Sequence, residues 1–162
     1  MPHQMNNIEK YSDTQLIDHI RHLFPICRSL TGKGIRETLS YFEKYHTEYK
    51  RLKFPSGKKV FDWNIPKEWK ITDAYIQHID SGKKFAQLKK NNLHLVGYSC
   101  PVNTILNLKD LLPKIHTLKE QPSLIPYVTS YYKKDWGFCL SEIEKSTLPD
   151  GNYKVLIDSE LF

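Results

Sequence analysis

The chain has 162 residues, of which 40% are hydrophobic, and a formal net charge of +6. This size and composition indicate one folded domain, with or without a small insertion, and exclude a disordered chain. No apolar run reaches the roughly 18–20 residues that span a bilayer, and the N-terminus has no apolar signal segment, so we expect a cytoplasmic protein with no membrane partner. The lysines form scattered doublets and no stripe, so we do not expect a nucleic acid partner.

Two helices are predicted first in chain order. In SDTQLIDHIRHLF, Ser12 and Gln15 have capping-box spacing, and apolar residues recur at helical spacing. The loop SLTGKG either fixes the start of a second helix, predicted at about 35–46, or seats an anion there. His19 and His22 have a spacing that two metal ligands can use, but no matched third ligand lies nearby in the sequence.

The chain then changes to short β-rich pieces. A strand is predicted at 49–54, followed by strands at 60–63, 71–79, 85–88 and 93–98, with a hairpin turn at Asp80-Ser81-Gly82. The segment 102–118 is predicted as an extended stretch that leads into a short helix. Trp63 and Trp69 flank Pro66, which is typical of a packed corner and also suits a binding platform.

The C-terminal third is predicted as two strands within 122–132 and 136–141, a short helix after Ser141, and a last strand at 151–162. The stretch TSYYKKDWGFCLSE, residues 129–142, combines much aromatic area with a short charged break. It is either a buried hairpin or strand–loop–strand, or the lining of a site.

Motifs that would assign a reaction are absent from the sequence. It contains no HExxH zinc helix, no GxSxG nucleophile turn and no GxxxxGK[ST] phosphate loop. We therefore predict no catalytic residue, no metal ligand and no cofactor within this chain.

Four long segments carry a family resemblance: LFPICRSLTGKGIRETL, FPSGKKVFDWNIPKEWKITDAYI, NNLHLVGYSCPVN and PYVTSYYKKDWGFCLS. Together they resemble the N-terminal part of bacterial aminopeptidase-like proteins, a formerly uncharacterised family related to the two-zinc aminopeptidases. The resemblance implies an α/β zinc-peptidase-like domain that is interrupted by a small β-rich insertion. Residues 1–60 would hold the N-terminal helices and the first strand, 61–122 the insertion, and 123–162 the return to the peptidase-like sheet.

The implied chemistry is hydrolysis of an N-terminal peptide bond, or of a related amide, by a metal-activated water. In the family the zinc ligands lie beyond the strand at which this chain ends, so we expect an inactive fragment of a hydrolase. Zinc is implied only for a full-length relative. The expected partners are a peptide or amide substrate and either the missing C-terminal part or a second copy of the chain.

Two interpretations of the aromatic residues stay open. Tyr131, Tyr132 and Trp136 are the candidates for the residues nearest to a substrate, although packing at the junction is favoured for this stretch. As an alternative function, the chain would be a non-enzymatic module that binds a peptide or a glycan through Trp63, Trp69 and Tyr75 of the β-rich insertion.

Overall fold

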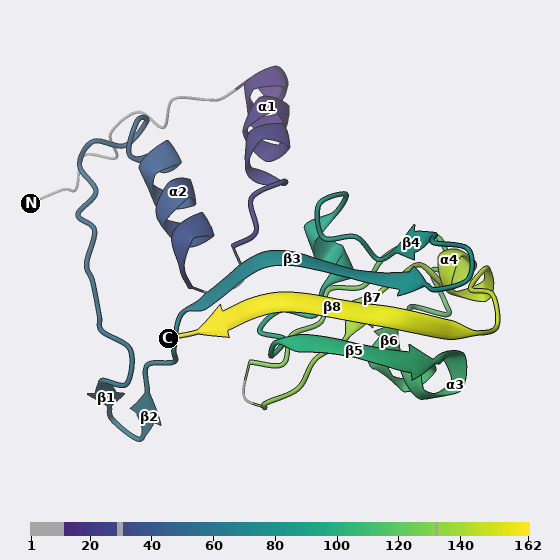
Figure 1. The fold of residues 1–162 in the computed structure, drawn as a ribbon. Coiled ribbons are helices and arrows are strands. Elements are labelled where there is room, and N and C mark those ends of the chain that lie inside the picture. Colours follow the sequence, from purple (N-terminus) through teal and green to yellow (C-terminus); the bar gives the residue numbers. More distant parts are fainter. Residues whose placement is uncertain (1–11, 29–30, 132) are drawn as a thin grey trace, which may run out of the picture.

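The computed structural model describes residues 12–28, 31–131 and 133–162, and its main feature is an antiparallel sheet of four strands (Figure 1). In spatial order the strands are β4 (Lys84–Phe85), β3 (Trp69–His78), β8 (Asn152–Leu161) and β5 (Val102–Asn107). Strands β3 and β8 pair along almost their whole length, from Trp69 opposite Leu161 to His78 opposite Tyr153. The last strand of the chain therefore lies in the middle of the sheet.

Alternating apolar residues explain why β3 and β8 form this sheet. Ala74 and Ile76 of β3 and Val155 of β8 are fully buried, whereas Lys154 of β8 is exposed. Residues two apart share one face of a strand, so one face of the sheet turns into the core. The strands predicted at 71–79 and 151–162 are confirmed, as is the turn at Asp80-Ser81-Gly82, which joins β3 to β4.

A layer of short elements contributes the other half of the core. These elements are η1 (Asn92–His94), α3 (Leu108–Leu111), η2 (Leu112–Lys114), β6 (Ile115–His116), β7 (Phe138–Cys139) and α4 (Glu142–Ser146). Leu111, Ile115, Phe138 and Leu140 from this layer belong to the same buried cluster as the sheet residues. The extended stretch and helix predicted within 102–118 correspond to β5 and to α3 with η2.

The boundary predicted between 61–122 and 123–162 runs through this core. Strand β8 comes from the second segment, and it pairs with β3 and β5 from the first. The fully buried Tyr153 of β8 also belongs to the same cluster as Ile76 of β3. Residues from both predicted segments therefore form one packed unit of mixed α and β structure.

Helices α1 (Asp13–Leu23) and α2 (Lys33–Phe42) confirm the two predicted helices. The predicted capping box at the start of α1 is present, because Ser12 accepts a hydrogen bond from the Gln15 amide and the Gln15 side chain accepts one from the Ser12 amide. Both helices lie at the end of the sheet where β3 begins (Figure 1). Within the described residues, no helix is long and apolar enough to cross a bilayer.

Two predicted strands near the end of this helical region are wrong. The segment 49–54 forms no strand, and its apolar residues Leu52 and Phe54 are exposed. Instead of one strand at 60–63, the chain makes a small hairpin of β1 (Lys59–Val60) and β2 (Trp63–Asn64). Phe61, with a φ of 55°, begins the turn between these strands. Alternating residues alone did not reveal that turn.

The strand predicted at 93–98 is also wrong. The side chain of Asn91 accepts a hydrogen bond from the Leu93 amide and starts the short helix η1, which shortens the extended part. Leu95 and Gly97 make only isolated bridges, to Phe138 and Thr129. The strand predicted at 85–88 shortens to β4, and that predicted within 122–132 to the single bridge at Thr129.

These bridges show how the stretch 129–142 is built. Its two arms do not pair with each other as a hairpin would. Thr129 bridges Gly97 and Phe138 bridges Leu95, so both arms lie against the segment that follows η1. The stretch is therefore a strand–loop–strand connection, and its second arm, with Phe138 and Cys139, is fully buried.

Candidate functional site

The predicted substrate-proximal residues lie at the margin of the core. The Tyr131 ring meets the Tyr98 ring edge to face, with centroids 5.1 Å apart, and the Trp136 ring meets Phe138 at 6.5 Å. Both Tyr131 and Trp136 are half-buried and pack against the core cluster. Tyr132 lies outside the described residues. Tyr131 and Trp136 thus each join the packing and keep part of their surface accessible.

The charged break next to Trp136 is fixed by an ion pair. Lys114 Nζ lies 2.7 Å from Asp135 Oδ1, and the same oxygen accepts a hydrogen bond of 2.8 Å from the Trp136 amide. The Lys114 hydrogen bond, followed by the amide bond, lowers the pKa of Asp135. Lys114 also lies 5.2 Å from the centre of the Trp136 ring. The Asp135 carboxylate therefore holds the loop in place as an anion, and not as a proton acceptor.

A row of rings leads from Tyr131 toward the helices. Tyr98 stacks on Trp69 with centroids 5.9 Å apart, and the Trp69 indole N–H donates a 3.0 Å hydrogen bond to the Ser99 carbonyl. The Tyr98 hydroxyl lies 2.6 Å from Thr31 Oγ1. Burial raises the pKa of this tyrosine. Tyr131, Tyr98 and Trp69 thus connect the predicted residues with the loop before α2.

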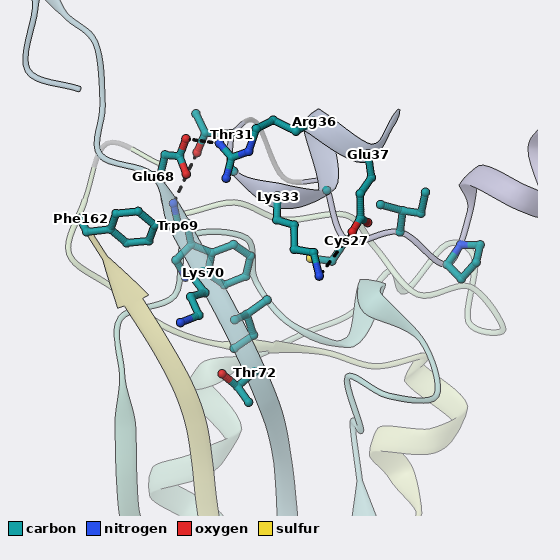
Figure 2. A pocket seen from close by; sticks show the side chains of 15 residues that line it. Cys27, Thr31, Lys33, Arg36, Glu37, Glu68, Trp69, Lys70, Thr72 and Phe162 are labelled. Atoms are coloured by element: carbon teal, nitrogen blue, oxygen red, sulfur yellow. Dashed lines mark hydrogen bonds and ion pairs between the residues drawn. The ribbon is translucent and has the colours of Figure 1, made fainter. Parts of the chain in front are cut away.

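At this junction the structure has a pocket of about 720 Å³ (Figure 2). This volume is within the range of roughly 300–1,000 Å³ that is usual for small-molecule sites. Its walls come from the segment after α1, the start of α2 and the residues preceding it, the beginning of β3 and the residue preceding that strand, and the residue that follows β8: Pro25, Ile26, Cys27, Thr31, Gly32, Lys33, Gly34, Arg36, Glu37, Glu68, Trp69, Lys70, Ile71, Thr72 and Phe162. A second hollow of about 300 Å³ shares Ile26, Cys27 and Trp69 with it.

The charges in this junction pocket are largely paired. Arg36 Nη1 lies 2.5 Å from Glu68 Oε1, and Lys33 Nζ lies 3.5 Å from Glu37 Oε1. The hydrogen bond to Glu68 raises the pKa of Arg36. Lys70 lies 3.8 Å from Glu160 on the neighbouring strand. With its carboxylates in ion pairs and an aromatic floor, the pocket suits binding or docking better than proton transfer.

Two glycines at the start of α2 allow it to lie close to neighbouring backbone. A Cβ added at Gly34 would lie 1.9 Å from the Cys27 carbonyl oxygen, and Gly32 has a φ of 92° that favours glycine. Gly32 is the N-cap of α2 but provides no side-chain hydrogen bond. Of the two interpretations of TGKG, this geometry favours a tight start of the helix.

Among residues 12–28, 31–131 and 133–162, no group of three or more His, Cys, Asp or Glu side chains could hold a metal ion. His19 Nδ1 lies 2.6 Å from the Tyr41 hydroxyl, and the His22 ring stacks on Tyr41 at 4.4 Å. This pair of histidines therefore contacts α2, and the described residues do not fit the zinc site that the resemblance implies for a full-length relative.

The sequence did not predict that these residues come together in the junction pocket. Arg36 and Glu68 are far apart in the chain, as are Thr31 and Tyr98, so no local spacing indicates either contact. The sequence predicts Trp69 as part of a packed corner or of a peptide- or glycan-binding platform, and not as a wall of this pocket. The one local signal was the pair of glycines in TGKG, whose lack of side chains permits the close approach.

Comparisons with known proteins place this geometry in a family. A family model described as "Domain of unknown function (DUF2172)" matches residues 68–160. A Clostridium acetobutylicum protein, named "Putative polysaccharide biosynthesis protein with aminopeptidase-like domain", is 44% identical over 163 residues, which cover 97% of this chain and 37% of that protein. This chain therefore spans little more than a third of that relative.

A solved structure agrees with that match. It is described as the "Crystal structure of putative peptidase" from the same organism, and it has a TM-score of 0.86 and 44% identity to this chain. The alignment covers 91% of this chain and 35% of that one. The predicted resemblance to bacterial aminopeptidase-like proteins is confirmed, and the chain belongs to the DUF2172 family.

Proposed function

We propose that this chain is the non-catalytic N-terminal part of a zinc aminopeptidase-like hydrolase, and that it is inactive on its own. The observation that carries the proposal is the 44% identity to a relative named for an aminopeptidase-like domain, across 97% of this chain. The similarity in fold to a structure described as a peptidase supports it. A peptide or amide substrate and a cytoplasmic location stay predictions from the sequence.

In this proposal the chain has a structural role, and the rest of the hydrolase carries the catalytic residues. Zinc would activate the attacking water in the full-length hydrolase. In this chain, the Arg36–Glu68 pair holds α2 to the residue before β3, and the Thr31–Tyr98 contact holds the loop before α2 to the segment after η1. The β-rich insertion would extend to about residue 160 and include β8, because β8 is a central strand of its sheet.

The proposal also gives Tyr131 and Trp136 a role beside the substrate. Both rings are half-buried and fixed at their inner edges, by Tyr98 and by Phe138. An aromatic ring that is fixed in this way offers rigid contact area to a peptide at a low cost in conformational entropy. In the full-length hydrolase we expect these rings to contact the substrate and not the metal.

Metal analysis and an activity assay test the proposal. After dialysis at neutral pH, the purified chain is expected to hold less than a stoichiometric amount of zinc and to leave an aminoacyl p-nitroanilide uncleaved. The full-length C. acetobutylicum relative, assayed in parallel with added zinc, should cleave it. Stoichiometric zinc together with cleavage by this chain alone would refute the proposal, and so would an inactive full-length relative across a panel of aminoacyl substrates.

One observation favours the alternative of a peptide- or glycan-binding module. Trp63 is 42% exposed on the β1–β2 hairpin. The other two rings offer less: Trp69 is buried, and Lys84 lies 3.7 Å from the centre of the Tyr75 ring. Calorimetric titration with a tetrapeptide and with a soluble oligosaccharide tests this function, and Trp63→Ala should abolish any binding that it explains.

A further inference from the structure

Eight exposed apolar side chains gather on the helical region. They line a groove, here called the helical groove, and are Leu16, Ile20, Phe24, Leu39, Phe42, Tyr45, Tyr49 and Leu52. It consists of two hollows, of about 300 and 490 Å³, which share Phe42 and His46 as lining residues. Each of its eight apolar side chains is at least 37% exposed, and Leu52 reaches 74%.

The two helices have too little packing of their own to explain this groove. Leu23 is the only buried residue of α1, and Gly34 the only one of α2. Isolated helices shorter than about 12–15 residues are marginal in water, and most helical stability comes from packing of the apolar face. These helices have 11 and 10 residues. Their apolar faces therefore need a covering surface.

Contiguous exposed apolar side chains that are bordered by polar residues are typical of protein interaction sites. A polar network borders the groove, because Arg51 bonds to Glu43 at 2.7 Å and to Ser40 at 2.8 Å. An apolar centre with a satisfied polar rim is the usual anatomy of a protein–protein interface. The groove thus suits a folded protein surface better than a small ligand.

The comparisons indicate which surface that is. The family model covers residues 68–160 and leaves the helices out, but the C. acetobutylicum relative matches 97% of this chain, helices included. Nearly two thirds of that relative lies outside the matched part, since the match covers 37% of it. A relative that matches both helices therefore carries a large additional segment.

We propose that the helical groove is the docking surface for the aminopeptidase-like segment that the relatives carry in addition to the part matched by this chain. This inference rests on the proposed function and names the partner through which the chain joins the hydrolase. The contact is an apolar surface of that segment, which packs on Leu16 and Ile20 of α1, Leu39 and Phe42 of α2, and Leu52.

The experiment compares one substitution in two settings. This chain is placed in the full-length C. acetobutylicum relative, in exchange for the 163 residues it matches, and is also studied alone. Ile20→Lys and Leu52→Lys are made in both proteins. Ile143→Lys on α4 is the matched control, because Ile143 is a helical isoleucine with 57% exposure against 54% for Ile20. The readout is the midpoint of thermal unfolding.

In the chain alone, all three substitutions are expected to move the midpoint by no more than about 2 °C, because the side chains are exposed. In the exchanged protein, Ile20→Lys and Leu52→Lys should lower it by at least about 5 °C, since each would place an ammonium group in a covered apolar contact. Ile143→Lys should change it little. Equal and small effects of all three in the exchanged protein would overturn the proposal.

Two further measurements keep the outcome decisive. If the exchanged protein fails to fold, this chain is co-expressed with the additional segment of the relative and studied by limited proteolysis. The segment should suppress cleavage within 12–54, and Ile20→Lys should restore it. Cleavage that the segment leaves unchanged would refute docking. Sedimentation of the chain alone tests the rival occupant, because a dimer that Ile20→Lys disperses would assign the groove to a second copy. None of these readouts depends on catalysis, so they can fail while the proposed function holds.

Discussion

The regions before and after residue 67 differ in what they do with apolar side chains. Between 68 and 160, Ile76, Phe138 and Tyr153 are fully buried in one cluster. Between 12 and 67, Leu23 is the only large apolar residue among those described that is buried. Both regions have regular secondary structure, so regular structure alone does not indicate a complete core.

This difference separates local from tertiary stability. Helix α1 has a full capping box and an apolar stripe, and both are present although the stripe is exposed. The β-rich region also has strands of only two residues, but the long-range pairing of its ten-residue strands β3 and β8 builds a closed core. Substitutions in the two regions should therefore have effects of different kinds.

The largest expected contrast is in thiol reactivity. Burial raises the pKa of Cys139 to about 12, which leaves a thiolate fraction about a thousandfold smaller than that of a thiol with a pKa near 9. Iodoacetamide at pH 8 should therefore modify Cys139 far more slowly than Cys27, which is half-buried beside the helices. Mass spectrometry of tryptic peptides measures both rates. Comparable rates in the native protein would show that the core is open.

The core region should be the more sensitive to truncation. Phe138→Ala removes a fully buried ring and is expected to lower the free energy of unfolding by about 3–5 kcal/mol, through lost burial and the cavity left behind. Leu52→Ala, at a 74% exposed position of the helical region, should change it by less than about 0.5 kcal/mol. Urea denaturation followed by circular dichroism compares the two variants, and similar losses would contradict the distinction.

The contact between α2 and the segment after α1 should respond to a single methyl group. In Gly34→Ala the new Cβ would lie 1.9 Å from the Cys27 carbonyl oxygen, so the loop or the helix has to move. Overpacking of this kind costs about 1–3 kcal/mol. Because the contact joins the start of α2 to the segment that follows α1, we expect faster proteolysis within 12–54 and an unchanged unfolding midpoint of the core. Lys33→Ala, at the neighbouring exposed position of α2, is the control and should leave the proteolysis rate nearly unchanged.

The smallest expected effect is at the start of α1. Ser12→Ala removes the capping side chain that accepts a hydrogen bond from the Gln15 amide, which costs about 1 kcal/mol of helix stability. Because α1 contributes little to the core, the far-ultraviolet signal at 222 nm should decrease slightly while the core midpoint stays unchanged. Ser12→Asp, which keeps an acceptor at the cap, should restore the signal. A lower core midpoint would mean that α1 and the sheet unfold together.

The sequence predicted elements wherever one pattern dominates. The alternation in β3 and β8 and the capping box of α1 each depend on neighbouring residues, and each prediction held. The segment 93–98 failed because the Asn91 side chain started a short helix there, and Tyr98, with a φ of 64°, turned the chain. At the start of this segment, one side-chain hydrogen bond determined the backbone conformation, although the apolar pattern predicted a strand.

The candidate site was less predictable for a related reason. The junction pocket depends on contacts such as Arg36 with Glu68 and Thr31 with Tyr98, which join residues distant in sequence. Tyr131 and Trp136 were noticed because aromatic residues are unusual beside a charged loop, but their partners Tyr98 and Phe138 come from the tertiary fold. Residue type indicated which side chains mattered, and topology decided where they lie.

The central place of β8 has a consequence for how the chain is made. Strands β3 and β5 are not neighbours in the sheet, and each pairs with β8. On the ribosome, β3 and β5 therefore emerge without their shared partner, and the closure that joins them waits for residues 152–161. Sheets that rely on such distant pairing form slowly and leave apolar strands exposed in the meantime. We expect nascent chains that stop before residue 152 to be bound by chaperones and cleaved readily by proteases. Once β8 has emerged from the ribosome, the chain should become resistant to proteases in a single step.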